Sequence, residues 1–298
     1  MKYNIKKEFG IYRYLNIPIN KFILKMAKIM LTIYPKGMKS TKNFSINKLK
    51  INCLDGKKIN TYLIRPRKTE AKIPLLIYFH GGGFVYKAAP HHYKLVKEYA
   101  KNANVAVAFV DYRLAFDTKF GTTLSDCVDA YNYILENADV LNIDKDKIGF
   151  AGDSAGGYLS LALIDYLSKN KLSLPKFQLL IYPVVDSNMT TESMKRFTDT
   201  PMWNSKLNKK MWEIYSKGNK VFNPLESDIS YMPKTYIETA EFDCLHDEGL
   251  QLHNKLKSSN VESQLYETKG TMHGYDVCCK SKTTKESIKN RIQFLKQF

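Results

Sequence analysis

From residue 73 onward, short runs of β-branched and aromatic residues alternate with amphipathic stretches of helix length. This alternation is typical of βα units and of a mainly parallel sheet. The predicted strands are nearly continuous in apolar residues, as expected for strands that helices cover on both faces. They span residues 75–79, 105–111, 147–151, 177–182, 235–239 and 263–267. We therefore expect an α/β fold.

The remaining regular elements complete this pattern. Helices are predicted at residues 92–102, 123–136, 155–168, 246–258 and 284–296. Two earlier runs, 44–54 and 57–66, flank Asp55-Gly56, a dipeptide typical of tight hairpins. The sheet is thus expected to open with an antiparallel pair and to contain eight strands, mostly parallel and flanked by helices.

Two segments do not follow the alternation, residues 1–43 and the insertion at about 187–222, which contains Trp203 and Trp212. Each could be a satellite helix packed on the core, or both could form a lid over an active site. We favour the lid. In the first segment, lysines at helical spacing accompany an apolar face that we expect to lie against the two tryptophans. The lysines are Lys21, Lys25 and Lys28, and the apolar face is Phe22, Met26, Ile29 and Ile33.

The positive charge of the chain is concentrated at its N-terminus. Residues 1–50 carry eleven Lys and one Arg against the single acid Glu8, which is +11 of the total +17. No helix-turn-helix, zinc-finger or RNA-binding signature accompanies this charge, so no nucleic-acid partner is expected. A peripheral anchor on anionic lipid is the alternative to the lid, and compositional drift is a third interpretation.

Cysteine usage and hydropathy bear on the compartment. The five cysteines lack metal-type or disulfide-framework spacing, which is typical of a reducing compartment. Three lysines interrupt the apolar run at 17–34, and no secretory signal is recognised. We expect a soluble, cytoplasmic protein and make no prediction of its oligomeric state.

The first motif that carries chemistry is Gly152-Asp153-Ser154-Ala155-Gly156, directly after a predicted strand and before a predicted helix. Glycines two residues on either side of a serine permit a tight strand-to-helix turn that exposes the serine hydroxyl. The N–H groups at the start of the helix can stabilise a developing oxyanion. Ser154 is therefore the candidate nucleophile.

The second motif is His80-Gly81-Gly82-Gly83-Phe84 at the end of another strand. No Gly-Lys-Ser/Thr follows and no G-x-G-x-x-G pattern is completed, so a nucleotide site is not expected. Successive glycines can instead bring backbone N–H groups to a substrate carbonyl oxygen. His80 and Gly81 are expected to anchor this loop.

A serine nucleophile requires a base that an acid orients. Of the histidines, His273 follows the last predicted strand and is the expected base, whereas four others are interpreted as surface or capping residues: His91, His92, His246 and His253. Asp243 follows its strand most closely, and we prefer it to Asp247, which opens a helix. The chain order Ser, Asp, His is the one that α/β-hydrolases use.

These motifs resemble the hormone-sensitive-lipase-like branch of the α/β-hydrolases, the bacterial esterases marked by HGGG and GDSAGG. The resemblance spans residues 45 to 298 and includes Asp111-Tyr112-Arg113-Leu114-Ala115, Tyr182-Pro183 and Asp243-x-Leu245-x-Asp247-Glu248-Gly249. It implies the α/β-hydrolase fold, a cap formed by residues 1–43 and an insertion at about 187–222, and a catalytic domain over 44–298. It also implies a triad of Ser154, Asp243 and His273, and an oxyanion hole formed by the N–H groups of Gly82, Gly83 and Ala155.

The expected activity is hydrolysis of short-chain acyl esters by a carboxylesterase, with a small-molecule ester as substrate and no metal or cofactor. Phe84 and Tyr158 are expected to line the substrate pocket, and Tyr86 and Lys87 to lie at its mouth. A related hydrolase of amides, formamides or acetylated sugars, and a non-catalytic small-molecule receptor, remain the alternatives.

Overall fold

The computed structural model describes residues 2–33, 39–67 and 71–298. Its centre is an eight-stranded sheet with the order β1-β2-β4-β3-β5-β6-β7-β8. β2 pairs antiparallel with both β1 and β4, and all other neighbours are parallel. The strands are β1 (Phe44–Asn52), β2 (Lys58–Pro66), β3 (Ile73–Phe79), β4 (Ala106–Asp111), β5 (Ile143–Asp153), β6 (Phe177–Ile181), β7 (Lys234–Phe242) and β8 (Ser263–Met272).

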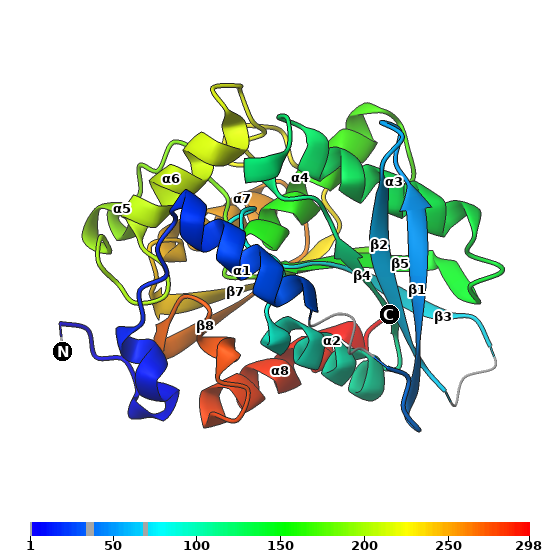
Figure 1. Ribbon diagram of the computed structural model, residues 1–298, viewed down its shortest axis with the longest axis horizontal. Coiled ribbons are helices and arrows are strands. Elements are labelled where there is room, and N and C mark those ends of the chain that lie inside the picture. The colour runs from blue at the N-terminus through cyan, green and yellow to red at the C-terminus, as the bar shows by residue number, and fades with distance from the viewer. Residues whose placement is uncertain (1, 34–38, 68–70) are drawn as a thin grey trace.

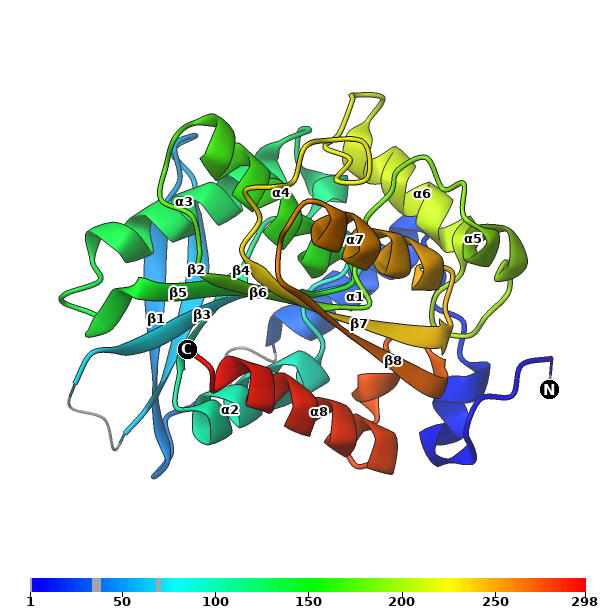
Figure 2. The same cartoon turned by 180° about the vertical axis from the view of Figure 1, so that it is seen from behind.

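Helices cover both faces of this sheet, which explains why its inner strands are apolar throughout (Figures 1 and 2). On one face lie α3 (Thr122–Glu136), α4 (Ala155–Lys169) and α7 (His246–Ser258), and on the other α2 (Pro90–Ala103) and α8 (Lys282–Leu295). Each layer of helices buries its own hydrophobic core against the sheet. The predicted eight-stranded, mostly parallel architecture is confirmed.

Two strands are longer than the sequence pattern indicates. β5 begins at Ile143 because a shift in register lets this residue pair with Ile73 ahead of the regular ladder. β8 continues to Met272, which pairs with Phe242 beyond an irregularity in β7. The extra residues of both strands are largely polar or glycine, so their strand conformation depends on pairing rather than on local apolar pattern.

The two segments outside the alternation form helices beside the carboxyl ends of the strands. They contain the 3-10 helix η1 (Lys7–Tyr14), α1 (Lys21–Ile33), α5 (Glu192–Arg196) and α6 (Ser205–Ser216). In Figure 1, α1 crosses the front of the molecule between α6 and α2. The two segments touch where Met202 N donates to Leu15 O at 2.7 Å. Residues 34–38 of the predicted cap segment lie outside the described residues.

The predicted orientation of α1 is wrong. Phe22 is 74% exposed, Met26 48% and Ile29 55%, whereas Leu24 is buried; the side chain of Ile33 lies outside the described part of the chain. α1 therefore packs inward through a different face, because the rows of apolar residues at 22, 26, 29 and at 24, 31 lie on different sides of the helix. The Trp203 ring instead abuts Gly83.

Candidate active site

Ser154 occupies the turn between β5 and α4 with a positive φ of 54°. Non-glycine residues rarely adopt this conformation, and it persists here because the flanking backbone is fixed on both sides. Ser154 N donates to Ile181 O at 2.8 Å, and Val184 N donates to Ser154 O at 3.0 Å. A Cβ on Gly156 would lie 1.9 Å from Phe79 O, so only glycine permits this approach of helix to strand.

His273 and Asp243 continue from this serine in a chain of hydrogen bonds. His273 Nε2 lies 2.9 Å from Ser154 Oγ, and His273 Nδ1 lies 2.6 Å from Asp243 Oδ2. All three side chains are buried, and Asp243 Oδ1 also accepts from Leu245 N at 3.0 Å. The arrangement can draw a proton from the serine hydroxyl and stabilise the resulting imidazolium.

Asp247, the other acid that follows β7, is engaged elsewhere. Its Oδ2 accepts from Ser193 N at 2.7 Å, and its Oδ1 lies 2.8 Å from His246 Nδ1. The side chain thus ties the start of α7 to the start of α5. No hydrogen bond joins it to His273 within the described residues.

The glycine loop after β3 is held by a buried carboxylate that the sequence analysis did not single out. Asp153 Oδ1 accepts from Gly81 N at 2.9 Å and from Tyr78 Oη at 2.7 Å, and its Oδ2 lies 3.1 Å from His92 Nε2. Burial favours the neutral carboxyl, but the charge of His92 and the two side-chain hydrogen bonds outweigh it and hold the pKa of Asp153 well below its usual value. Asp153 therefore joins the serine turn to the glycine loop.

The interpretation of His91 and His92 as surface or capping residues is only partly right. His92 does cap α2, since its Nδ1 accepts from Ala89 N at 2.9 Å, but the side chain is buried and its other nitrogen contacts Asp153. His91 lines the cavity beside Ser154, and its Nδ1 is buried and has no hydrogen-bond partner among the described residues. Burial, and then the charge of His92, lower the pKa of His91 to about 3, so its imidazole is neutral near pH 7.

His80 lies behind the loop and not at the serine. Its ring stacks on Tyr112 with centroids 4.3 Å apart, its Nδ1 lies 2.7 Å from Gly81 O, and Tyr112 Oη donates to His80 O at 2.5 Å. Burial is the main reason that the pKa of His80 is lowered to about 3, with the charge of His92 next. These contacts fix the loop's direction as it leaves β3.

Three backbone N–H groups near Ser154 have no acceptor among the described residues, namely those of Gly82, Gly83 and Ala155. Buried N–H groups are normally paired, so an open set of this kind is suited to a ligand oxygen. Gly83 has φ 60°, and a Cβ there would lie 2.6 Å from Trp203 Cη2. Any side chain would therefore push the loop away from its present position.

A cavity of about 270 Å³ opens onto Ser154 and His273. Its other lining groups come from the glycine loop and from the two segments outside the alternation, including Ile17, Leu31, Tyr86, Lys87, Met202 and Trp203. Lys87 Nζ lies 2.5 Å from Asp111 Oδ1, which neutralises its charge. His91 and the paired side chains of His92 and Asp153 also lie in the wall, and most of the remaining wall is apolar.

Phe84 and Tyr158 do not line this cavity, which corrects their predicted role. Both are buried, and the Phe84 ring stacks on Tyr215 at 4.1 Å and meets Tyr158 edge-on at 5.8 Å. Phe84 has φ 60°, and this left-handed turn directs its side chain into the core behind the loop. Tyr158 Oη donates to Phe222 O at 2.9 Å and so supports the insertion.

Tyr182 packs against His273 and connects it to a buried cluster of charged residues. The Tyr182 ring meets His273 edge-on at 4.8 Å, and its hydroxyl donates to Asp276 Oδ1 at 2.5 Å. Asp276 Oδ2 lies 2.9 Å from Arg291 Nη1, and Arg291 also donates two hydrogen bonds to Glu238, one to each carboxylate oxygen. Arg291, Glu238 and Asp276 are all fully buried. No local sequence pattern predicts this cluster, because Glu238 lies in β7, Asp276 in the loop after β8 and Arg291 in α8.

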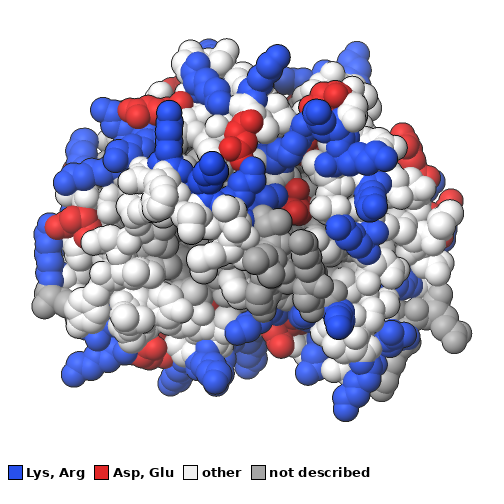
Figure 3. All heavy atoms as spheres, in the orientation of Figure 1, with Lys and Arg blue, Asp and Glu red and all other residues white. Residues whose placement is uncertain are grey.

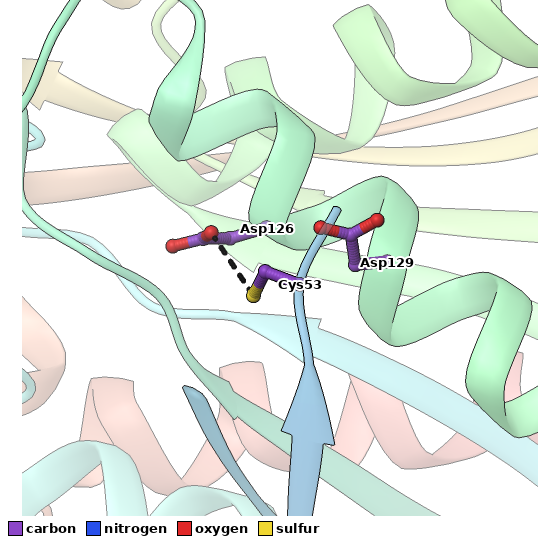
Figure 4. Close-up of side chains that lie close together, drawn as sticks. All are labelled: Cys53, Asp126 and Asp129. Carbon is purple, nitrogen blue, oxygen red and sulfur yellow. Dashed lines mark hydrogen bonds between the residues drawn. The ribbon is translucent and has the colours of Figure 1, made fainter. Parts of the chain in front are cut away.

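One cluster of potential metal ligands lies elsewhere, where Cys53 after β1 faces Asp126 and Asp129 of α3 (Figure 4). Asp126 already pairs with Arg113, with 2.6 Å between Asp126 Oδ1 and Arg113 Nη2, and it accepts from Cys53 Sγ at 3.6 Å. Burial, followed by the charge of Asp126, raises the pKa of the Cys53 thiol to about 12. Asp126 thus already has a counter-charge in Arg113, and the contact with Cys53 joins the end of β1 to α3.

Comparison with known proteins agrees with this geometry. A family model described as "alpha/beta hydrolase fold" matches residues 76–277. A protein of Acanthamoeba polyphaga mimivirus named as an α/β hydrolase is 31% identical over 74% of this chain and 66% of its own length. The ethyl acetate hydrolase of Pseudomonas putida is 30% identical over 77% of this chain and 75% of that enzyme. The solved structure of a bacterial heroin esterase has a TM-score of 0.88 at 26% identity and covers 99% of this chain and 98% of its own. The chain belongs to the α/β-hydrolase fold family, in its hormone-sensitive-lipase-like branch.

Proposed function

We propose that the chain is a carboxylesterase that hydrolyses short-chain acyl esters through Ser154, His273 and Asp243. The observation that carries this proposal is the unbroken relay from Ser154 Oγ to His273 at 2.9 Å and from His273 to Asp243 at 2.6 Å. The relay opens onto the cavity beside the N–H groups of Gly82, Gly83 and Ala155, which have no acceptor in the described part of the chain. A non-catalytic receptor would not need a serine, a histidine and an aspartate to be hydrogen-bonded in this order beside free N–H donors.

The reaction has two halves that share one histidine. Ser154 Oγ attacks the ester carbonyl carbon while His273 Nε2 takes the hydroxyl proton, and the N–H groups of Gly82, Gly83 and Ala155 stabilise the oxyanion. Collapse of this intermediate expels the alcohol, which receives the proton from His273. Water then attacks the acyl-enzyme, with His273 as base, and releases the carboxylic acid and free Ser154. Asp243 orients the imidazole throughout.

The size and polarity of the cavity favour small, uncharged acyl groups. About 270 Å³ lies below the roughly 300–1,000 Å³ of sites that hold drug-sized ligands. The names of two relatives, an ethyl acetate hydrolase and a heroin esterase, point toward acetyl-type esters. Amides, formamides and acetylated sugars present the same carbonyl to the relay and are the alternative substrates.

We further propose that residues 1–43 and about 187–222 form a cap over a catalytic domain of residues 44–298. Ile17 and Leu31 from the first segment, and Met202 and Trp203 from the second, line the cavity above Ser154. Tyr86 Oη, on the glycine loop, donates to the carbonyl oxygen of Pro18. The cap is therefore tied to the loop that carries two of the oxyanion donors.

The compartment is part of the same proposal. All five cysteines are free thiols, as is usual in a reducing environment, and we place the enzyme in the cytoplasm. Within the described ranges, no helix is both long and apolar enough to cross a bilayer.

The deciding experiment combines a fluorophosphonate probe with a panel of p-nitrophenyl esters of increasing acyl length. We expect the probe to label the wild type and not Ser154→Ala, and kcat/KM to be highest for acetyl and propionyl esters. Amides, formamides and acetylated sugars serve as the comparison substrates. Ester hydrolysis within tenfold of wild type in Ser154→Ala would overturn the assignment of the nucleophile, and a preference for amides would replace the proposed substrate class.

A further inference from the structure

The exposed large apolar side chains of this protein are concentrated near the N-terminus. Twelve such side chains occur in the described residues, and seven of them lie between positions 11 and 30. Four are on α1, where Phe22 is 74% exposed, Met26 48%, Ile29 55% and Met30 70%. Single exposed apolar residues are ordinary on a soluble protein, but a contiguous group on one helix marks an interaction surface.

The charges around this group are predominantly positive, and Asp117, which pairs with Lys28, is the acid that lies beside α1. Residues 9–54 contain nine Lys and Arg and no acidic residue. On α1, Lys21 and Lys25 are exposed and form no ion pair within the described ranges, while Lys28 pairs with Asp117. Figure 3 shows Lys and Arg side chains gathered along one edge of the uncharged surface over α1. An apolar stripe edged by lysines is typical of helices that lie in the headgroup layer of a membrane.

Beside α1 the surface is also hollowed. A groove of about 1080 Å³ runs between α1 and the residues near α6, with Leu24, Ile29 and Ile214 in its wall and Lys21, Lys25 and Lys217 around it. This combination offers room for apolar groups next to positive charge. The apolar wall of the groove complements the acyl chains of an anionic phospholipid, and the lysines around it complement the lipid phosphate.

We propose that α1 docks the enzyme onto an anionic phospholipid surface, with Phe22, Met26, Ile29 and Met30 entering the headgroup layer and the lysines contacting lipid phosphates. A second copy of the chain is a poorer occupant, because a twofold contact would place this predominantly positive surface against itself. Nucleic acid would use the lysines but leave the four apolar side chains in water.

This surface goes beyond the proposed esterase activity, but it is connected to the cavity through the same helix. Leu31 of α1 and Ile17 just before it line the cavity over Ser154. Docking would therefore bring the mouth of the cavity near the membrane, where apolar esters concentrate. Hydrolysis of a water-soluble ester needs no such contact.

The test is co-sedimentation with vesicles of an equal mixture of phosphatidylcholine and phosphatidylglycerol, compared with pure phosphatidylcholine. The full-length protein is expected to bind the mixed vesicles and to be released by salt, because salt screens the lysines. Lys21→Gln/Lys25→Gln should weaken binding roughly thirtyfold, from about a five- to sixfold loss per lysine. Phe22→Ser/Met26→Ser should weaken it at least as much.

A matched control removes apolar side chains that are just as exposed but lie elsewhere. Leu54 and Val140 are each 86% exposed, and Leu54→Ser/Val140→Ser is expected to bind vesicles like the wild type. All three double variants should hydrolyse p-nitrophenyl acetate at the wild-type rate, which separates this surface from the active site. No binding to the mixed vesicles, equal binding to neutral vesicles, or equal loss in the control would overturn the proposal. A dimer in sedimentation analysis that Phe22→Ser/Met26→Ser dissociates would assign the surface to a second copy instead.

Discussion

Replacement of Arg291 by methionine tests how the buried residues behind His273, the proposed base, are held in place. The guanidinium is fully buried and pairs with two fully buried carboxylates, Glu238 at 2.5 Å and Asp276 at 2.9 Å. Methionine fills a similar volume but leaves both carboxylates without a counter-charge. Breaking a buried ion pair from one side typically costs about 3–5 kcal/mol, since the remaining charge is neither hydrated nor paired.

This loss should be measurable by guanidinium-induced unfolding at pH 7 and by thermal melting. For a chain of 298 residues, a loss of 3–5 kcal/mol corresponds to a decrease in Tm of about 5 to 8 °C. Activity should fall as well, because Asp276 accepts the hydroxyl of Tyr182, whose ring packs on His273. If His273 is the base, as proposed, the effect on kcat should exceed that on KM, because the displaced imidazole acts in the chemical step.

The control is the triple variant Arg291→Met/Glu238→Gln/Asp276→Asn, which removes the charges together. It should recover most of the lost stability, because a neutral cluster carries no uncompensated charge. A single variant within about 1 kcal/mol of wild type, or a triple variant no more stable than the single one, would refute the argument that charge pairing is what the cluster supplies.

Three further predictions concern the site and its cap. Asp243→Asn should lower kcat on p-nitrophenyl acetate by roughly 10⁴. Asp247→Asn should change kcat only a few-fold, because the Asp247 carboxylate accepts a backbone N–H at the start of α5. Steady-state kinetics that showed the larger loss for Asp247→Asn would identify Asp247 as the acid. Because the pKa of His91 is lowered to about 3, mainly by burial, the unfolded chain binds a proton below about pH 6.5 that the folded chain does not, so stability falls as pH drops from 6.5 toward 3. His91→Asn should reduce this dependence by about 1.4 kcal/mol per pH unit in urea titrations, and an unchanged slope would mean that His91 is protonated in the folded state. Tyr86→Phe removes the hydrogen bond to Pro18, which is worth about 1 kcal/mol. The variant should show faster amide exchange in residues 15–31 and unchanged global unfolding. Unchanged protection of these amides would show that other contacts hold the cap.

The order of strands and helices along the chain could be predicted from the sequence, because the strands of the sheet are local runs of apolar residues. The predicted helix at residues 246–258 matches α7 to the residue, and the Asp55-Gly56 turn marks the β1–β2 hairpin. What local pattern could not supply is strand length fixed by pairing, as at Ile143 and Met272. These residues extend their strands only because a partner strand is present.

The candidate site could likewise be predicted only in part from the local sequence. Ser154, Asp243 and His273 each follow a strand directly, so topology alone brings them together at one edge of the sheet. The cavity wall has no such rule, and Phe84 was misassigned because its positive φ reverses the direction of its side chain. The sequence could suggest that Trp203 belonged to a lid, but not that its ring would abut Gly83.

The bond from Tyr86 to Pro18 has a consequence for how the enzyme would choose among substrates. Tyr86 lies three residues after Gly83, and Pro18 precedes α1, so this hydrogen bond connects the proposed cap, here called the roof, to the loop that carries the proposed oxyanion donors. An acyl group too large for the closed cavity would lift the roof and draw the donors away from the carbonyl oxygen. Such a substrate could still enter and be held by its apolar surface. The enzyme would therefore discriminate by turnover rather than by affinity, and oversized esters would act as competitive inhibitors.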